Sequence, residues 1–221
     1  MATIIEGENL NKLYRVSLAR RSVGGYEGSS MVGVHVLPLG TGKLALAASE
    51  GFVLAFAVLD LVHDLQNEVV IPPSILEKIN PRVVREGGGL AIHDAANTVE
   101  IVLKAGEPVN TLVSLNRKHF PAWHKVLPVG TLKAWPHAFI SNAYLELASR
   151  ILGEDTNRSA LDFRRYAVGE AENMPQFATF NGVTVALMPV AYAQGFGPEM
   201  GIGADATHAA IHAVRVGVLN A

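Results

Sequence analysis

The sequence repeats one pattern of predicted elements, and this repetition limits the possible folds more than any other feature. An amphipathic helix predicted over 8–20 precedes three short apolar strands predicted over 32–39, 42–49 and 52–59. The pattern then recurs, with a short strand at 68–72, a helix at 73–85 that Pro81 interrupts, and strands at 89–94, 97–105 and 109–116. Each such unit is about 60 residues long, which indicates repetition at the supersecondary level and an α+β fold.

A third, single unit follows a connector. The segment RKHFPAWHKVLPVGTLKAWP is bounded by prolines and is the best candidate for a domain boundary. Beyond it we expect a helix at 141–152 that ends at Gly153, and a hairpin over 176–190 whose turn is Asn181-Gly182. The sequence therefore predicts domains at 1–128 and 129–193, and an additional tail at 194–221 that is expected to be helical.

Composition excludes several classes of protein. The chain has no cysteine, which rules out disulfides, thiolate zinc sites and cysteine nucleophiles and fits a reducing, cytoplasmic location. Its net charge of −2 excludes a uniformly basic nucleic-acid binder, but it does not exclude a protein with a local basic face. The N-terminal segment lacks the apolar core of a secretory signal, and no clean apolar stretch is long enough to span a membrane.

Motifs for catalysis or cofactor binding are weak. PLGTGKL has Leu37 where a phosphate loop needs its first glycine and Leu44 where it needs a hydroxyl side chain, so a hairpin is the better interpretation. GFGPEMGIG lacks the strand–turn–helix context of a dinucleotide site. His208 and His212 are four residues apart but lack a third ligand, and His93 precedes a turn. We therefore expect no catalytic residues, no metal site and no cofactor.

Four segments, in order, resemble the bacterial DNA polymerase III β sliding clamp, the processivity factor of replication. They are AASEGFVLA at 47–55, VVIPPSILEKI at 69–79, SLNRKHFPAWHKVLP at 114–128, and FISNAYLELA with VALMPV at 139–148 and 185–190. The resemblance implies clamp-like repeats of one helix packed on antiparallel strands. Complete clamps have three domains, whereas this chain has one two-unit domain that resembles the middle one and a single unit that resembles part of the last.

The resemblance also implies a pocket for partner peptides, carried by a DNA polymerase or other proteins. The pocket residues would be Ser49, Gly51, Phe52, Val53, Leu54, Pro121, Lys125, Val126, Met188 and Pro189. Flexible apolar side chains beside exposed backbone suit such a groove. The alternative is that Leu54, Val126 and Met188 are core residues. Clamps carry His and Arg at the positions of Phe52 and Val53, so a more apolar pocket is expected here.

In clamps, helices line a ring and slide over duplex DNA through basic side chains that do not read bases. The matching candidates lie on or near the predicted helices: Lys12, Arg15, Arg20, Arg21, Lys78, Arg82, Arg85 and Arg150. Ordinary solvated helices carry the same residue types, so both interpretations stay open. Ring closure in the family takes about twelve units, so three per chain imply a tetramer and four a trimer. A monomer is the alternative.

Three functional hypotheses follow. The first is a clamp-like accessory protein of replication or repair that docks partner peptides and can contact or encircle DNA. The second is a clamp-fold module that does not encircle DNA and binds clamp-binding peptides as a competitor or adaptor. The third, an enzyme on an unrelated α+β scaffold, rests only on the histidines and the glycine-rich tail.

Overall fold

The computed structural model describes residues 2–20, 32–40, 42–79, 81–102, 108–115, 122–127, 132–134, 142–153, 164–166, 175–187 and 214. For 81, 82, 108–112, 114, 125, 126, 132–134, 142 and 164–166 it describes the backbone alone. The described chain consists of three units, each of which contains a first strand, helical structure and three further strands.

Unit 1 contains β1 (Thr3–Glu6), α1 (Gly7–Ser17), β2 (Val34–Pro38), β3 (Lys43–Ser49) and β4 (Val53–Asp60). Helix α1 forms because its apolar residues recur with helical spacing, and Leu10, Leu13 and Val16 are fully buried. The strands are continuous apolar runs, since β3 and β4 are covered on both faces. Gly40 and Gly42, both with positive φ, flank the turn between β2 and β3, which confirms the hairpin interpretation of PLGTGKL.

Unit 2 contains β5 (Val69–Ile71), α2 (Pro73–Leu76), α3 (Pro81–Arg85), β6 (Gly89–His93), β7 (Thr98–Val102) and β8 (Pro108–Ser114). The predicted helix over 73–85 is divided in two because a proline inside a helix cannot donate its backbone hydrogen bond. Pro73 and Pro81 both stand at the first residue of a helix, where the missing N–H costs nothing.

Unit 3 follows the one-turn helix η1 (Trp123–Val126) and contains β9 (Leu132–Ala134), α4 (Asn142–Leu152), β10 (Arg164–Tyr166), β11 (Gln176–Phe180) and β12 (Val183–Leu187). Asn181 and Gly182 have φ of 50° and 72°, and the strands beside them pair in register from Phe180 and Val183. This is the tight hairpin that the Asn-Gly pair predicts.

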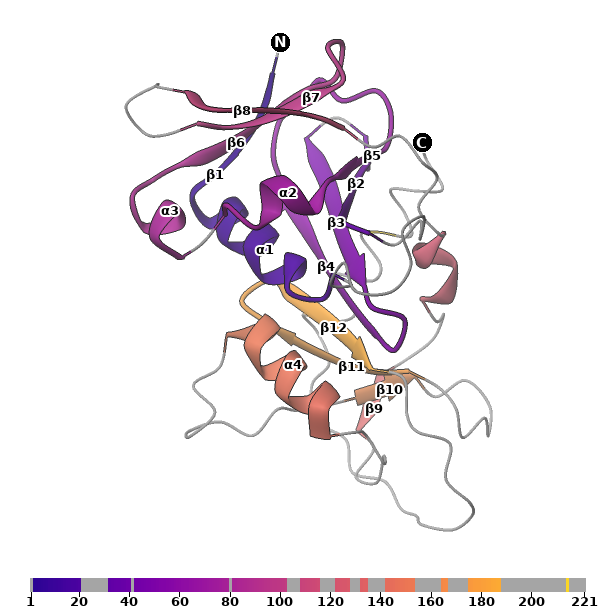
Figure 1. Cartoon of the computed structure of the whole chain (residues 1–221). Helices are drawn as coiled ribbons and strands as arrows, with labels where there is room; N and C mark the ends of the chain where they lie inside the picture. Colours follow the sequence, from indigo (N-terminus) through magenta and orange to yellow (C-terminus); the bar gives the residue numbers. More distant parts are fainter. Residues whose placement is uncertain are drawn as a thin grey trace.

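Units 1 and 2 exchange their first strands. β1 pairs with β6 in the sheet β1-β6-β7-β8, while β5 pairs with β2 in the other sheet. That second sheet continues into unit 3, because β4 pairs with β12, and its order is β5-β2-β3-β4-β12-β11-β10-β9. In unit 3 the first strand, β9, instead pairs with β10 of its own unit. Figure 1 shows α1, α2 and α4 on the viewer's side of the sheets.

The larger core lies between the helices and the sheets. Val53, Ala55 and Ala57 of β4 face this core, together with α1 and the buried residues Ala148, Ile151 and Leu152 of α4. A smaller cluster lies on the opposite face, where alternate residues of the same strands, such as Leu54 and Phe56, meet Trp123. We call this second group the outer cluster.

The structure confirms the predicted α+β class and most of the predicted elements. The helix predicted over 8–20 ends at Ser17 and continues as a turn. The strands β1, β9 and β10, of three or four residues, are too short to leave a periodic signal, so the sequence did not predict them. Val214 in the tail is helical and buried; the rest of 194–221 lies outside the described residues.

Gly33 provides a test of the strand exchange. It has φ of 111°, and a Cβ there would lie 2.3 Å from the carbonyl oxygen of Ile71 in β5. Gly33→Ala is expected to destabilise the protein by at least about 3 kcal/mol, since backbone strain and a backbone clash add. Gly40→Ala is the matched control. Gly40 also has a positive φ (84°), but a Cβ there would have nothing within 4 Å. The substitution should therefore lower the free energy of unfolding, measured by urea denaturation, by only about 1 kcal/mol. Equal losses of stability in the two variants would contradict the close contact between position 33 and the Ile71 carbonyl.

Candidate functional site

The junction between β4 and β12 brings together segments that are distant in the sequence. Five residue pairs join the strands in antiparallel register, from Val53 opposite Leu187 to Ala57 opposite Val183. The β3–β4 turn therefore lies beside the end of β12, the position from which Met188 and Pro189 continue. Those two residues lie outside the described part of the chain.

Local hydrogen bonds shape the β3–β4 turn. The Ser49 hydroxyl accepts from the backbone N–H of Gly51 at 3.0 Å, and the N–H of Glu50 donates to the Val53 carbonyl at 3.1 Å. Gly51 has φ of 109°, and the space around its Cα is open. Phe52 is 59% exposed and stacks on Tyr144 of α4, with ring centroids 5.6 Å apart and planes 19° apart. The turn is therefore fixed at both ends, and its tip is exposed.

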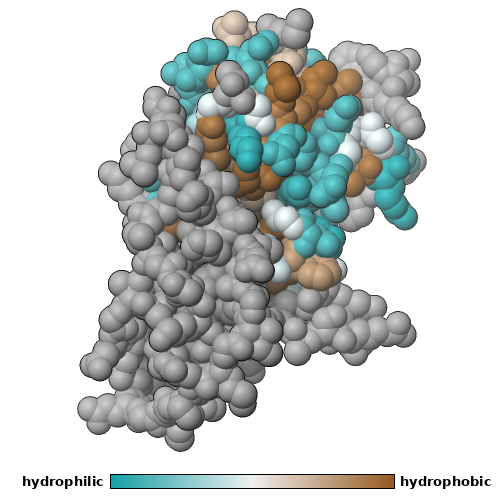
Figure 2. Space-filling model, turned by 180° about the vertical axis from the view of Figure 1, so that it is seen from behind, coloured by the Kyte–Doolittle hydropathy of each residue, from teal (hydrophilic) through white to brown (hydrophobic). Residues whose placement is uncertain are grey.

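The outer cluster lies behind this turn. Leu54, which is 9% exposed, and Phe56 contribute from β4, Phe177 and Ala186 from the last hairpin, and Trp123 and Leu127 from the connector. The Trp123 and Phe56 rings are 5.6 Å apart. Figure 2 shows the molecule from behind, with apolar surface between polar patches in the upper part. The outer cluster itself is buried, and Val214 of the tail packs into it as well, so segments far apart in the sequence form one buried apolar cluster beside the turn.

A buried hydrogen-bond relay holds the connector on the sheet. Trp123 Nε1 donates to Nδ1 of His35 in β2 at 3.0 Å, and His35 Nε2 lies 3.1 Å from the Glu68 carboxylate. Because Nδ1 accepts, Nε2 carries the proton and donates to Glu68. Burying an imidazole costs little free energy when both of its nitrogens have hydrogen-bond partners. A buried nitrogen without a partner instead costs the free energy of its desolvation. The relay therefore fixes η1 over the outer cluster.

The predicted pocket residues divide into three groups. Ser49, Gly51, Phe52 and Leu54 lie at the junction, on the turn or the outer face. Val53 is fully buried in the core on the helix side. Lys125 and Val126 belong to η1, where only their backbone is described, and Pro121, Met188 and Pro189 lie outside the described residues.

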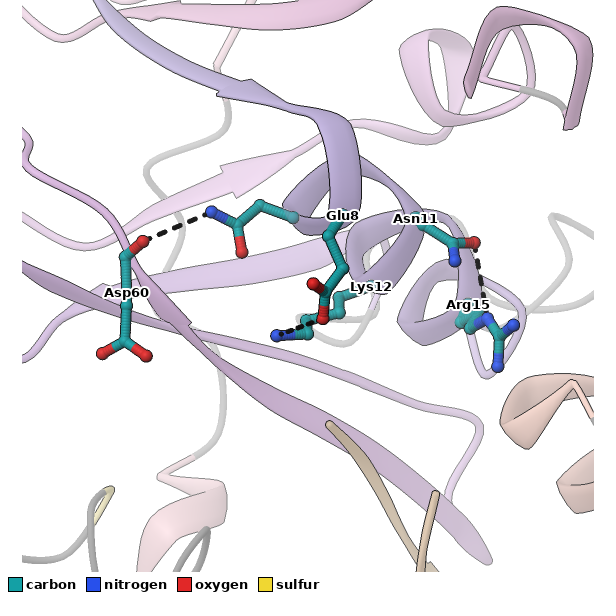
Figure 3. A network of polar contacts seen from close by, with 6 residues as sticks. Glu8, Asn11, Lys12, Arg15 and Asp60 are labelled. Carbon is teal, nitrogen blue, oxygen red and sulfur yellow. Dashed lines mark hydrogen bonds and ion pairs between the residues drawn. The ribbon is translucent and has the colours of Figure 1, made fainter. Parts of the chain in front are cut away.

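Two of the predicted DNA-facing residues make contacts with unit 3. Arg15 donates to the carbonyl of Leu152 at the end of α4, and its Nε lies 3.4 Å from the Asn11 side chain. Lys12 pairs with Glu8 at 3.2 Å, and its side chain approaches Gly182 in the last turn. Figure 3 shows these pairs along α1, with Asn9 donating to the Asp60 carbonyl. These side chains help to position α1 against unit 3.

The remaining predicted basic residues lie nearer to solvent. Lys78, Arg85 and Arg150 are exposed, and Arg20 donates to the Ser17 carbonyl at 3.0 Å. The Arg82 side chain and all of Arg21 lie outside the described part. Acidic residues are exposed on or beside the same helices: Glu8, Glu77, Glu86 and Glu146. The helix side therefore carries charges of both signs.

Within the described residues, no group of three His, Asp or Glu side chains could hold a metal ion. His93 is paired with Glu100 at 2.8 Å on the adjacent strand, and His208 and His212 fall outside the described ranges. No helix in the described part is long and apolar enough to cross a membrane.

Comparison with known proteins shows which solved structures share this architecture. No model of a protein family matches the sequence, and neither does any curated protein. Among solved structures, the DNA polymerase sliding clamp from Pseudomonas aeruginosa matches with a TM-score of 0.64 and 13% identity, over 87% of this chain and 67% of the clamp. The chain has the fold of a bacterial sliding clamp. This confirms the fold that the four sequence segments implied, on a chain that spans about two thirds of the length of the clamps it matches.

Two further matches were determined with ligands. The sliding clamp from Bartonella birtlesii, bound to griselimycin, has a TM-score of 0.63 at 13% identity, with 86% of this chain and 66% of the clamp covered. The Helicobacter pylori β clamp, bound to a DNA ligase peptide, has a TM-score of 0.59 at 10% identity and the same coverage. Identities this low show the shared fold, while function requires its own arguments.

Sequence reasoning missed the two residues that anchor this site from outside it, His35 and Tyr144. His35 is the one polar residue inside the apolar run VGVHVLPL, and a lone histidine in a buried strand signals a buried partner. Tyr144 lies within the helix predicted over 141–152, and nothing in the sequence of that helix indicates a contact with the β3–β4 turn.

The relay leads to a stability prediction. Trp123→Phe retains the aromatic packing on Phe56 but leaves His35 Nδ1 without its donor, so the free energy of unfolding should fall by about 1–3 kcal/mol. Double-mutant analysis with His35→Leu provides the control, measured by urea denaturation. The two changes should cost less together than the sum of the single changes, because each removes the same hydrogen bond. If the losses of stability in the two single variants add in the double variant, the hydrogen bond between Trp123 and His35 contributes nothing to stability.

Proposed function

We propose that this chain is a clamp-fold accessory protein of DNA replication or repair that docks peptides from partner proteins, among them a DNA polymerase. The observation that carries the proposal is the β4–β12 junction. There strand β4, the η1 connector and the last hairpin, which are far apart in the sequence, meet in the outer cluster beside the β3–β4 turn.

The chemistry of the junction suits an apolar peptide. Leu54 lies at the edge of the outer cluster, next to a turn whose Gly51 leaves the backbone accessible. Groove-type recognition combines such apolar anchors with exposed backbone groups. The Helicobacter pylori clamp, which shares the fold, was determined with a DNA ligase peptide, and this supports a peptide as the ligand class.

Departures from the clamp pattern indicate which peptides fit. Phe52 and Val53 replace the His and Arg of the resembled turn, and Phe52 adds an exposed ring that Tyr144 supports. Phe52 therefore adds exposed apolar surface at the turn, whereas Val53 is buried in the core and adds none. We expect the junction to favour peptides with bulky apolar or aromatic side chains over acidic ones.

Truncation of Leu54 tests the peptide site. Leu54→Ala should weaken binding of a fluorescein-labelled DNA ligase peptide about tenfold, the effect of losing roughly 1.4 kcal/mol of apolar contact. Val58→Ala is the matched control. It removes apolar volume from the same face of β4, about 13 Å farther along the strand. Fluorescence anisotropy measures both, after circular dichroism shows that the variants are folded.

The control variant should bind as the wild type does. Equal loss of affinity in Val58→Ala and Leu54→Ala would indicate a general effect on folding rather than a local site. Absence of saturable binding to the wild-type chain would exclude this class of peptide as a partner and overturn the proposal.

Contact with duplex DNA is the second candidate activity. The exposed Lys78, Arg85 and Arg150 favour it, since they lie on or just beyond helices of the kind that would face a duplex in a clamp. The exposed glutamates on the same segments oppose it, and Lys12 and Arg15 are engaged with unit 3. The charge pattern therefore favours the module that docks peptides without enclosing DNA, acting as a competitor or adaptor.

A salt titration separates these two roles. If the helices bind phosphates, replacing Lys78, Arg85 and Arg150 by alanine should lower the slope of log affinity against log salt, by about 0.9 for each phosphate that is no longer neutralised. Anisotropy with a labelled duplex of about 30 base pairs measures the slope. An unchanged slope, or absence of binding to the wild type at low salt, would assign the protein to the non-encircling role.

A further inference from the structure

The outer cluster contains one residue from the tail, Val214, which is helical and fully buried. The other members belong to the eight-stranded sheet, to the turn after β2 or to the connector. We propose that Val214 anchors the tail on the peptide-docking site of its own chain, so that a partner peptide must displace it in order to bind. The proposal rests on the peptide-docking function proposed above and concerns how that site is regulated.

The outer face of the eight-stranded sheet carries large apolar side chains. Helices α1 and α4 contact the strands from the opposite side, and an antiparallel sheet can leave its second face in water. Here that second face is covered around the outer cluster, since Phe56 and Phe177 are 0% and 1% exposed. Among the described residues, the cover from outside the sheet comes from the connector and from Val214. Val214 therefore packs on the apolar surface that a docking peptide would use.

The connector and Val214 differ in the side-chain contacts that hold them. Trp123 of the connector donates to His35 at 3.0 Å and packs against Phe56, with ring centroids 5.6 Å apart. A peptide that displaced Trp123 would leave a buried imidazole nitrogen without its donor, which is unfavourable. The Val214 side chain has no polar atom, so another apolar side chain of similar volume can take its place without breaking a side-chain hydrogen bond. Val214 is therefore the part of the cover that a peptide can replace.

The sequence around Val214 has the composition expected of a ligand for this site. Residues 206–221, ATHAAIHAVRVGVLNA, contain no acidic residue, and Arg215 is the only Lys or Arg among them. Ile211, Val214 and Val218 follow the spacing of three and four residues that places side chains on one side of a helix. Helical peptides that bind in apolar grooves present their anchors with this spacing. The segment thus agrees with the expected preference of the junction for apolar over acidic peptides.

Attachment to the same chain favours the tail over a free peptide. An intramolecular contact competes at the effective concentration that its tether sets, whereas a partner peptide competes at its own concentration. The apparent Kd for a peptide is the intrinsic Kd divided by the fraction of molecules whose site is open. Weakening the Val214 contact should therefore raise that fraction and tighten peptide binding. A residue that only stabilises the site would have the opposite effect, because its loss would disorder the site.

Peptide affinity tests the competition. Val214→Ala removes two methyl groups from the outer cluster and should lower the apparent Kd for the fluorescein-labelled DNA ligase peptide about tenfold, measured by fluorescence anisotropy. Val16→Ala in α1 is the matched control, since Val16 is also helical and fully buried but belongs to the core on the helix side. This control should leave the affinity unchanged. Circular dichroism checks that both variants are folded.

Thiol labelling tests the displacement directly, because the chain has no cysteine of its own. In Val214→Cys the thiol should react slowly with a maleimide while it is buried, and faster in the presence of saturating peptide. Val16→Cys is the buried control and should react slowly in both conditions. Val62→Cys, at a position that is 86% exposed, gives the reaction rate of an accessible thiol.

The outcomes separate this competition from peptide docking itself. If the peptide binds Val214→Ala no more tightly than the wild type, or if Val16→Ala gains affinity equally, the competition is overturned while the docking site stands. A labelling rate of Val214→Cys that saturating peptide leaves unchanged also overturns the competition alone. If neither the wild type nor Val214→Ala binds the peptide, both proposals fail.

Discussion

The structure depends on antiparallel pairing between β4 and β12, two strands about 130 residues apart in the chain. This pairing attaches unit 3 to unit 1, extends one sheet to eight strands and places the β3–β4 turn beside the last hairpin. Side chains add to it on both faces. On the helix side, Arg15 binds the end of α4 and Phe52 stacks on Tyr144; on the other, Leu54 and Phe56 meet the connector. Without the pairing, the candidate site would not exist.

Local features of the fold could be predicted from the sequence, and long-range ones could not. The Asn181-Gly182 hairpin and the break at Pro81 follow from the φ angles and hydrogen bonds these residues allow, which neighbouring residues alone determine. The exchange of β1 and β5 between units depends on strands of three or four residues and on partners far along the chain. The bond between Trp123 and His35 is of the same kind, since no local pattern pairs a connector tryptophan with a strand histidine.

Basic residues on helices illustrate why residue type alone did not decide function. Lys12, Arg15 and Arg150 are equivalent in the sequence, as cations at helix positions. In the fold, Arg15 reaches a helix C-terminal carbonyl, where a cation is stabilised by the helix dipole, and Lys12 lies over the last turn. Arg150 faces solvent four residues after Glu146, a spacing that pairs opposite charges on a helix. Burial, rather than charge, separates the residues that join units from those available to a partner.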